Sequence, residues 1–443
     1  MAQTIPTVSF SDSLRFNLVH VLPYYLQGIF TRSKFWARFW TKFHPDPLAV
    51  KFGYYLRKKY KNDYLYLYML ANKTLYVIDY AGAMRVLDNS PALYAESRLK
   101  RLGMAHFQPN ALTISRGEAW RERREWTEAV LDSGHGLHRH ATQFLDIIRH
   151  EVDFRQAGST LQWSDIEALF EKVSMQIIFG KAARDDVSLW ARLKQMLRES
   201  NRVFGLRTSK HFEPFYAKIR GYIREPENGS LVSGFGHAHS TDTTHVENQI
   251  PHWMFAMNET LAANTARALA LIVAHPEAET HVREEMALAD LLSPHGIDSL
   301  KYLEGCIHEA MRLWPTTPML VRETVQADQL GGTMIPPKTQ VLIPSNFNHR
   351  DQATYPFANT FSPEIWQTEE ANYHFNHFSN GAQGCPGQGL ALFIAKAVLA
   401  ILLSTNQYIL KQPTLQADRP MPYAYNYFEL VLSRHPAPSG PHT

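Results

Sequence analysis

The stretch Asn380–Gly389, NGAQGCPGQG, places the single cysteine Cys385 among four glycines and a proline. Glycine permits positive φ angles and lets a large flat group come close to the backbone. Pro386 suits the first position of a helix, and the apolar run after it predicts a helix over residues 387–404. The free N–H groups and the positive dipole end of that helix would stabilise a thiolate at Cys385.

A thiolate on so open a turn is either a nucleophile or a metal ligand. A nucleophile needs a base and an oxyanion site, and His374 and His377 lie near enough in sequence to keep that interpretation open. A haem ligand needs small residues around the sulfur so that the porphyrin face can approach, which the glycines supply. A purely structural thiol is the third interpretation of this turn.

The composition favours a globular protein with a large core. The chain has 443 residues, 45% of them hydrophobic, and a formal net charge of +3, which does not indicate nucleic acid as a partner. It has two cysteines, Cys306 and Cys385, so no disulfide framework beyond one bridge is possible, and this fits a reducing compartment. We expect Cys306 to be a small core side chain.

The amino-terminal sequence contains no signal peptide pattern, and no apolar run approaches the roughly 18 residues of a membrane span. We therefore expect a cytoplasmic protein without a transmembrane anchor. Residues 1–45 are expected to form a lead-in to the main body. Within residues 28–47, GIFTRSKFWARFWTKFHPDP, aromatic and basic residues alternate. A first helix packed on the body is the favoured interpretation, and contact with a membrane surface is the alternative.

The remaining pattern predicts a mainly helical fold with small sheets, in one domain over residues 1–443. A nearly continuous apolar helix is expected from residue 250 until Pro276 stops it, and it should cross the protein interior over roughly 40 Å. A second helix is expected from about Asp298 to Trp314. Short strands are expected within residues 319–345, and an exposed loop within 225–247.

Five motifs resemble those of the cytochrome P-450 superfamily and occur along the chain in the superfamily's order. FSNGAQGCPG, Phe378–Gly387, matches its Phe-x-x-Gly-x-x-x-Cys-x-Gly signature. The others are GEAWRERR with Trp120 and Arg124, EAMR followed by LWPTTP, NHRD at 348–351 and FSPEIW at 361–366. The resemblance covers roughly residues 50–435. It implies the fold of that superfamily, with haem b held between the long central helix and the helix that follows Cys385.

The resemblance also implies roles for particular residues. Cys385 would ligate the haem iron as a thiolate, with Gly381 and Gly387 leaving room for the porphyrin. Phe378 would pack near the sulfur and help to set the iron potential. Trp120, Arg124 and Arg322 would contact the haem propionates. The pair Glu309 and Arg312 would give structural support behind the ligand loop.

The sequence AMNET, residues 256–260, lies in the long helix and is similar to the superfamily's oxygen-binding segment. Ala256 and Thr260 are four residues apart and would face the same way. The resemblance implies that Glu259 and Thr260 organise water and deliver protons during oxygen activation. An ordinary buried threonine beside an exposed glutamate is the alternative.

Three residues depart from the pattern of the superfamily. Met257 replaces a second small residue, so the groove for oxygen is expected to be narrower or bent differently. Gln383 stands where many members have an arginine or histidine beside a propionate. Ile365 stands where an arginine commonly joins the Glu309–Arg312 pair, so that network must be completed by another group.

The implied function is a haem-thiolate monooxygenase that oxidises a small apolar substrate. No flavin or iron–sulfur pattern is present, so electrons are expected from separate partners, a ferredoxin or flavodoxin with its reductase, steered by basic residues on the ligand side. The protein is expected to be a monomer. Alternatives are a different outcome such as desaturation, ring coupling or peroxide use, and a non-catalytic haem sensor. The expected pocket residues, which are equally compatible with plain core, are Phe107, Phe255, Met257, Met319, Leu320 and Tyr425.

Overall fold

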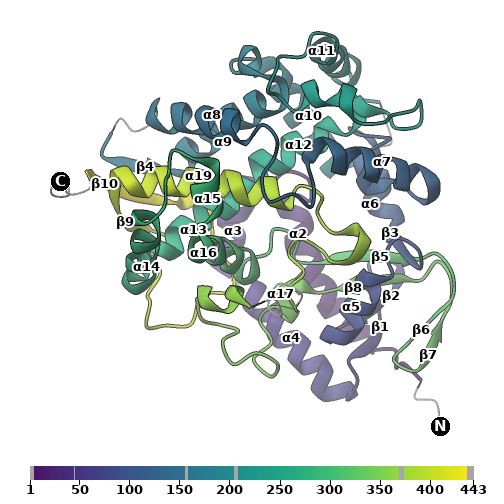
Figure 1. Ribbon diagram of the computed structural model, residues 1–443. Helices are drawn as coiled ribbons and strands as arrows, with labels where there is room; N and C mark the ends of the chain where they lie inside the picture. Colours follow the sequence, from purple (N-terminus) through teal and green to yellow (C-terminus); the bar gives the residue numbers. More distant parts are fainter. Residues whose placement is uncertain (1–3, 44, 155–157, 204–207, 369–373, 437–443) are drawn as a thin grey trace.

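The computed structural model describes residues 4–43, 45–154, 158–203, 208–368 and 374–436. Helices dominate, and a smaller sheet-containing part lies beside the helical part (Figure 1). The mainly helical fold with small sheets, expected from the sequence, is therefore confirmed. The lead-in expected over residues 1–45 is described from residue 4 onward.

The largest sheet among the described residues has the strand order β1-β2-β8-β5-β3. Its strands pair antiparallel except β2 and β8, which are parallel, with Thr74 opposite Gln340. In β1 successive residues point to opposite faces of the sheet, so that Leu65 and Leu67 are buried in one hydrophobic cluster while Tyr64 and Tyr66, partly buried, pack against another. The strand bounds are β1 Tyr64–Met69, β2 Asn72–Val77, β3 Tyr94–Glu96, β5 Leu320–Thr324 and β8 Gln340–Ile343.

The short strands expected within residues 319–345 are confirmed. They are β5 and β8 of the large sheet, and β6 Asp328–Leu330 with β7 Thr333–Ile335, which form a hairpin. Gly331 and Gly332 make its turn with φ angles of +57° and +73°, a conformation that glycine adopts most readily. A further sheet combines β4 Thr160–Gln162, β10 Val431–Pro436 and β9 Asn406–Gln412.

The long central helix consists of three consecutive segments. These are α12 Ile250–Phe255, the π-helical turn η6 Ala256–Leu261 and α13 Ala262–Ala274. Nearly all of α13 is buried, as its apolar sequence predicted. The helix ends before Pro276, which begins α14 Pro276–Ala287. The sequence did not predict the π-helical turn, which includes the segment AMNET.

Two helices hold the segments behind the cysteine loop. The second predicted helix is α16 Lys301–Leu313, which begins later than expected because α15 Pro294–Asp298 comes first. The helix after the cysteine is α19 Gln388–Thr405, so Pro386 lies in the preceding turn rather than at its first position. Among the described residues, α19 alone is long and apolar enough to cross a membrane, and 72% of its apolar window is buried inside the protein.

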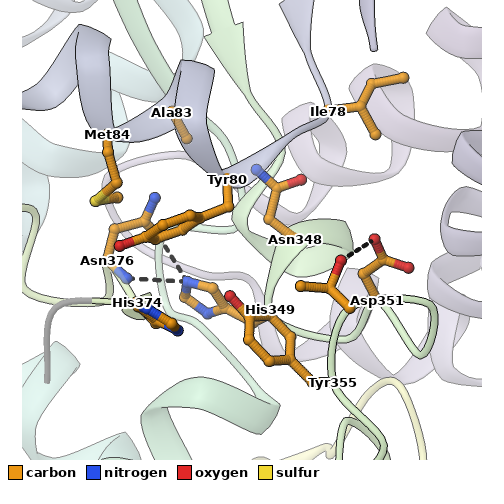
Figure 2. A pocket seen from close by; sticks show the side chains of 11 residues that line it. Ile78, Tyr80, Ala83, Met84, Asn348, His349, Asp351, Tyr355, His374 and Asn376 are labelled. Atoms are coloured by element: carbon orange, nitrogen blue, oxygen red, sulfur yellow. Dashed lines mark hydrogen bonds between the residues drawn. The ribbon is translucent and has the colours of Figure 1, made fainter. Parts of the chain in front are cut away.

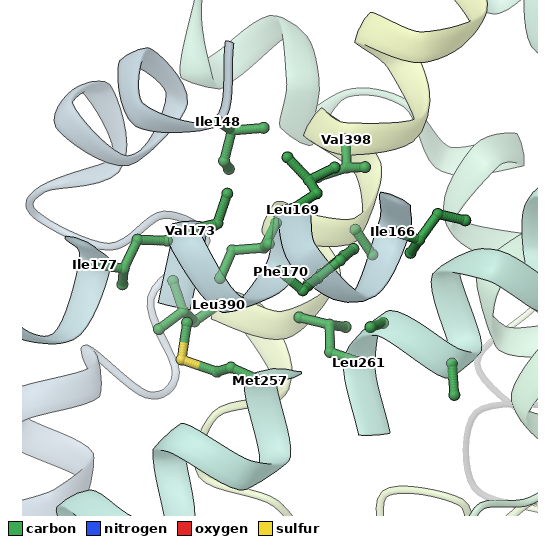
Figure 3. Close-up of a cluster of buried hydrophobic side chains, with 14 of the residues drawn as sticks. Ile148, Ile166, Leu169, Phe170, Val173, Ile177, Met257, Leu261, Leu390 and Val398 are labelled. Atoms are coloured by element: carbon green, nitrogen blue, oxygen red, sulfur yellow. The ribbon is translucent and has the colours of Figure 1, made fainter. Parts of the chain in front are cut away.

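The main core lies where α19 meets α9 Trp163–Phe179 and the π turn (Figure 3). Phe170 and Val173 of α9 contribute to this cluster together with Leu261 of the π turn and Val398 of α19. The burial of such side chains is the main favourable contribution to folding. The core therefore fixes the π turn and the start of α19 relative to each other.

The other helices surround this core and the large sheet (Figure 1). The amino-terminal ones are α1 Phe10–Phe16, η1 Asn17–Val21, α2 Leu22–Gln27, α3 Lys34–Phe43 and α4 Pro45–Tyr60. Those that follow are α5 Tyr80–Asp88, α6 Arg98–Ala105, α7 Gly117–Leu131, α8 Ala141–Phe154, α10 Val187–Val203, α11 Phe212–Arg224 and α17 Ser345–Asn348. The 3-10 turns are η2 Leu112–Ile114, η3 Lys181–Ala183, η4 Val232–His237, η5 Val246–Asn248, η7 Pro363–Gln367, η8 Gly381–Gln383 and η9 Tyr427–Glu429.

Two segments flagged in the sequence pack on the body. Helix α3 forms ion pairs from Lys34 to Glu167 of α9 and from Arg38 to Glu429 of η9, while Phe35, Phe39 and Phe43 are exposed. Residues 225–247 are not simply an exposed loop. Phe235 is buried because its ring packs edge-on against Trp126, with 4.7 Å between the ring centroids.

Candidate active site

The loop between η8 and α19 presents Cys385 as an exposed residue. The loop is fixed by its backbone, because the N–H of Cys385 donates to the carbonyl of Phe378 across 2.9 Å. Desolvation by the surrounding protein raises the pKa of the Cys385 thiol, and the N–H of Gly387 and the charge of Arg124 act in the opposite direction. A coordinated metal ion deprotonates such a thiol outright.

Gly381 explains why the signature requires glycine at that position. Its φ angle is +66°, and a Cβ atom there would lie 2.5 Å from the carbonyl oxygen of Leu87 in α5. Both the backbone conformation and the space therefore exclude a larger residue. The contact holds the loop directly against the end of α5.

Arg124 joins helix α7 to the cysteine loop. Its guanidinium donates to the carbonyl oxygen of Gly384 across 2.6 Å and to Glu128 one helical turn away, also across 2.6 Å. Gly384 immediately precedes Cys385, so Arg124 places a positive charge beside the thiol. Trp120, one turn earlier in α7, is partly buried.

Arg322 approaches the same region from β5 and is 3% exposed. It pairs with Glu96 of β3 across 3.1 Å, and its Nη2 lies 3.5 Å from the hydroxyl of Ser379. Its Nε has no hydrogen-bond partner among the described residues, and the same is true of Oε1 of Gln383. Because an unpaired buried polar group is costly, the Nε of Arg322 is suited to a second anionic group in addition to Glu96. No motif in the sequence indicated Glu96 as a partner of Arg322.

Glu309 and Arg312 form a fully buried ion pair in α16, with 2.5 Å between Arg312 Nε and Glu309 Oε1. Arg312 also donates to three backbone carbonyls, those of His349, Ala358 and Thr360. Such a charge pair is tolerated in the core when its remaining donors and acceptors are satisfied.

The group that completes this network is Trp366. Its indole N–H donates to Oε1 of Glu309 across 3.0 Å, and the backbone N–H of Ser362 donates to Oε2 across 2.8 Å. These two groups donate the hydrogen bonds to Glu309 that the apolar side chain of Ile365 cannot provide. The missing arginine at Ile365 was evident from the sequence, but sequence spacing alone does not indicate that Trp366 takes over its role.

Two histidines, one buried and one partly buried, connect α16 with the cysteine loop. Nδ1 of His308 and Nε2 of His377 are 2.8 Å apart, and the His308 ring stacks on Trp366. Burial lowers the pKa of His308 to about 4 and that of His377 well below its ordinary value, so both are neutral at pH 7. The ring centroids of His377 and Phe378 are 5.2 Å apart, which leaves His377 as a packing neighbour of the loop.

The π turn carries the predicted acid–alcohol pair. Burial raises the pKa of Glu259 to about 7, and the hydroxyl of Thr31 donates to its Oε1 across 2.8 Å. Ala256 and Thr260 lie in the same turn and are partly buried. π turns inside α-helices occur frequently at functional sites.

The predicted pocket residues divide into separate groups. Phe107 and Phe255 lie together, with their rings edge-on and 6.3 Å between the centroids. Met257 belongs to the main core and lies beside Leu390 of α19 (Figure 3). The others lie in different clusters, with Met319 against the amino-terminal helices, Leu320 on the large sheet and Tyr425 stacked on Trp314.

A small pocket lies beside α5 and the segment after α17 (Figure 2). It is lined largely by polar side chains, among them Asn348, Asp351, Asn376 and His349, whose Nε2 lies 2.6 Å from Oδ1 of Asn376. None of the predicted haem or substrate residues lines it. Its polar groups are of the kind that hold ordered water.

Comparison with known proteins agrees with these features. The family model for cytochrome P450 matches residues 235–422. Cyclooctat-9-en-7-ol 5-monooxygenase of Streptomyces melanosporofaciens is 26% identical over 67% of this chain and 72% of its own length. Cytochrome P450 714B3 of Zea mays is 26% identical over 67% of this chain and 63% of its own length.

Other relatives align over shorter segments. Cytochrome P450 4c3 of Drosophila melanogaster is 30% identical over 36% of this chain and 31% of its own length. The solved structure of retinoic acid bound cyanobacterial CYP120A1 matches the fold with a TM-score of 0.71, at 18% identity, over 86% of this chain and 93% of that one. The matched family model, these relatives and the shared fold support a member of the cytochrome P450 superfamily of haem-thiolate monooxygenases, whose cofactor is haem b.

The residues present fit a haem. The loop presents an exposed thiol, and the buried guanidinium of Arg322 keeps one donor without a protein partner among the described residues. A group with a metal centre and peripheral carboxylates satisfies both requirements. Cys385 would hold the iron, and Arg322, Arg124 and Trp120 are the candidates for holding the carboxylates.

Proposed function

We propose that the protein is a monooxygenase that oxidises a small apolar molecule with electrons from separate redox proteins. The observation that carries this proposal is that the cysteine loop and the π turn both adjoin helix α19. The loop of Cys385 precedes α19, and the acid–alcohol pair Glu259 and Thr260 lies on the π turn that packs on the same helix.

Haem bound through a cysteine thiolate favours cleavage of the dioxygen bond, which is the chemistry that an oxygen-inserting enzyme needs. The role of Cys385 is to hold the metal, and Gly381 and Gly387 keep bulky side chains away from it. Arg124 places positive charge beside the thiol and ties α7 to the loop. The buried pair Glu309–Arg312 supports the loop from behind through the neighbouring backbone.

Glu259 is the group suited to exchanging protons with solvent. A carboxyl with a pKa of about 7 releases and regains a proton near neutral pH, which is the range in which general acid–base groups are most effective. Thr260, the next residue of the π turn, supplies a hydroxyl that passes protons inward through ordered water. The alternative role, an ordinary buried threonine, predicts that its removal leaves the pH profile unchanged.

The substrate class is proposed from the side chains and from the relatives. Phe107 and Phe255 form an apolar aromatic surface near the π turn. One relative is named for a cyclic alkenol and one similar structure was solved with retinoic acid, and both compounds are largely hydrocarbon. A hydrocarbon-rich molecule such as a terpenoid therefore fits best.

Electron supply is proposed to come from a ferredoxin or flavodoxin with its reductase, in the cytoplasm. The exposed face of α7 beside the cysteine loop carries Arg121, but Glu118 lies 3.0 Å from it and partly neutralises the charge. Charge steering of an acidic partner is therefore expected to be weak at physiological salt.

A spectroscopic experiment tests the assignment. The purified protein, reduced and exposed to carbon monoxide, is expected to give the red-shifted haem band of thiolate ligation. Cys385→His should lose this band, and Cys306→Ala, which changes the other, buried cysteine, should keep it. A wild-type spectrum typical of histidine ligation would contradict the proposal.

A second experiment separates monooxygenation from the other outcomes. With surrogate redox proteins and isotopically labelled dioxygen, a monooxygenase places one labelled oxygen atom in the product. Desaturation or ring coupling would give an unlabelled product, and peroxide use would give a product that does not depend on reduced partner. A non-catalytic haem sensor would give no product with any substrate.

A further inference from the structure

A segment near the amino terminus lies against the candidate active site. We call residues 28–33, between α2 and α3, the N-terminal strap. Asn201 near the end of α10 anchors it, because its Oδ1 accepts the N–H groups of Ile29 and Phe30, each across 2.9 Å. The Nδ2 of Asn201 donates back to the carbonyl of Thr31, also across 2.9 Å. Three hydrogen bonds thus fix one side of the strap to α10.

The strap begins at a glycine for which no other residue fits. Gly28 has a φ angle of +98°, and a Cβ atom there would lie 2.2 Å from the carbonyl oxygen of Thr31. The chain therefore folds tightly back on itself at this point. The tight turn brings Thr31 to the central helix while Asn201 holds the backbone.

Two side chains of the strap face the candidate active site. The hydroxyl of Thr31 donates to Oε1 of Glu259 across 2.8 Å. Phe30 packs edge-on against Phe107, with 5.8 Å between the ring centroids, and Phe107 in turn contacts Phe255. The strap therefore meets both the predicted proton-handling acid and the predicted apolar surface.

On these contacts we propose that Thr31 is a positioning residue for Glu259, and that the N-terminal strap forms a wall of the site between this carboxyl and solvent. The proposal rests on the proton-handling role given to Glu259 under the proposed function. Thr31 lies 228 positions from Glu259 in the chain, and none of the five motifs described above includes it.

Charged groups from α10, α9 and the strap influence the pKa of Glu259. Lys194 of α10 and Arg32 of the strap favour the ionised carboxylate, and Glu167 of α9 opposes it. The charge of Glu259 in turn contributes to the raised pKa of Tyr427 in η9. The hydroxyl of Thr31 acts in the same direction as the two cations, since it donates to the carboxylate oxygen.

Substitutions at Thr31 test the proposal without any turnover. The pKa of Glu259 is measured on the haem-loaded protein by infrared titration of its carboxyl band, which is assigned by its absence from Glu259→Gln. In Thr31→Val the titration should move to higher pH, by roughly one pH unit, because the carboxylate loses a hydrogen-bond donor. Thr31→Ser keeps a hydroxyl and should titrate like the wild type.

The matched control is Thr41→Val in α3. The hydroxyl of Thr41 donates to the carbonyl of Ala37 in its own helix, across 2.8 Å, so the same chemical change there removes no contact with Glu259. Its titration should equal that of the wild type. If Thr31→Val also titrates like the wild type, Thr31 does not position Glu259.

Hydrogen exchange tests the wall. The amides of Ile29 and Phe30 should exchange slowly in the wild type and roughly tenfold faster in Asn201→Ala, which removes their shared acceptor. Fast exchange in the wild type would overturn the proposal of a wall. Both readouts are independent of oxygenation. A protein that keeps the strap but forms no labelled product therefore refutes only the proposed function.

Discussion

The indole N–H of Trp366 donates to Oε1 of Glu309 across 3.0 Å, in the interior behind the cysteine loop. Glu309 also accepts from Arg312 and from the backbone of Ser362, so both of its carboxylate oxygens are satisfied. A buried charge pair is stable only when its hydrogen bonds are complete. Trp366 thus lets the chain dispense with the arginine that Ile365 replaces.

Trp366→Phe removes this donor and should lower the free energy of unfolding by about 1–3 kcal/mol beyond the effect of the smaller ring, because a buried carboxylate oxygen loses its partner. Denaturant unfolding of the haem-loaded protein measures the change. The control is Trp163→Phe, since Nε1 of Trp163 is buried without a hydrogen-bond partner in the described part of the chain. Equal losses in the two variants would show that the indole N–H contributes nothing.

Gly381→Ala should destabilise the cysteine loop. The new methyl group meets the carbonyl oxygen of Leu87 at 2.5 Å, and the backbone is left with an unfavourable positive φ angle. Gly332→Ala has nearly the same φ angle, +73°, but its methyl group meets nothing within 4 Å. The difference between the two variants isolates the steric effect.

We expect Gly332→Ala to lose about 1–2 kcal/mol of unfolding free energy, the cost of the backbone conformation alone. Gly381→Ala should lose more and should also retain less haem per polypeptide after gel filtration. Equal haem content in the two variants would mean that the fit of the loop against α5 is not required for cofactor binding.

Glu304→Gln should destabilise the protein because it removes the nearer of the two carboxylates that pair with a buried lysine, the other being Asp298 at 3.4 Å. Nζ of Lys396 in α19 is 2.6 Å from Oε2 of Glu304, and Lys396 is 1% exposed. Because Asp298 still contacts Lys396, the loss should be about 1–2 kcal/mol, less than for a fully unpaired buried charge, and the double variant with Lys396→Met should recover part of it. A double-mutant cycle on unfolding free energies gives the coupling, and additive losses would contradict the pairing.

The same pair gives a pH dependence. Burial alone would raise the pKa of Glu304, but Lys396 outweighs it and lowers that pKa below its ordinary value. The stability that Glu304 contributes is therefore complete above about pH 4.5 and is lost as the pH falls through the lowered folded-state pKa. Glu304→Gln should flatten this acid limb of the thermal unfolding profile.

Glu259 gives a pH dependence of the opposite sign. Burial raises its pKa to about 7, so between about pH 4.5 and 7 the folded protein holds a proton that the unfolded chain releases. Its contribution to stability is present below pH 4.5 and is lost as the pH rises through 7. The wild-type melting temperature should fall over this range relative to that of Glu259→Gln. If the melting temperatures of the two proteins change in parallel with pH, the pKa of Glu259 is not raised and its carboxyl is exposed to water.

Local motifs were enough to predict the elements around the cysteine. The glycines of the loop, the pair Glu309–Arg312 and the helix after Cys385 are each encoded within a few residues, so their spacing can be read directly. The apolar pattern predicted the central helix for the same reason. Its π turn escaped prediction because the pattern continues through residues 256–261 without a glycine, a proline or a change of period.

The groups that complete the site lie far apart in the chain. Glu309 and Trp366 are 57 positions apart, and Arg322 reaches Glu96 from a different strand. Such pairs leave no periodicity in the sequence, because only the fold decides that they meet. The residues given to the haem and to proton handling therefore stay predictions until the variants above are measured.

The contact between Thr31 and Glu259 has a practical consequence for anyone who engineers this protein. Trimming the first few dozen residues would remove Thr31 together with its hydrogen bond to Glu259, and fusing a redox module at that end could displace both. If a truncated enzyme consumes reductant without forming product, the loss of the amino-terminal segment would explain the uncoupling.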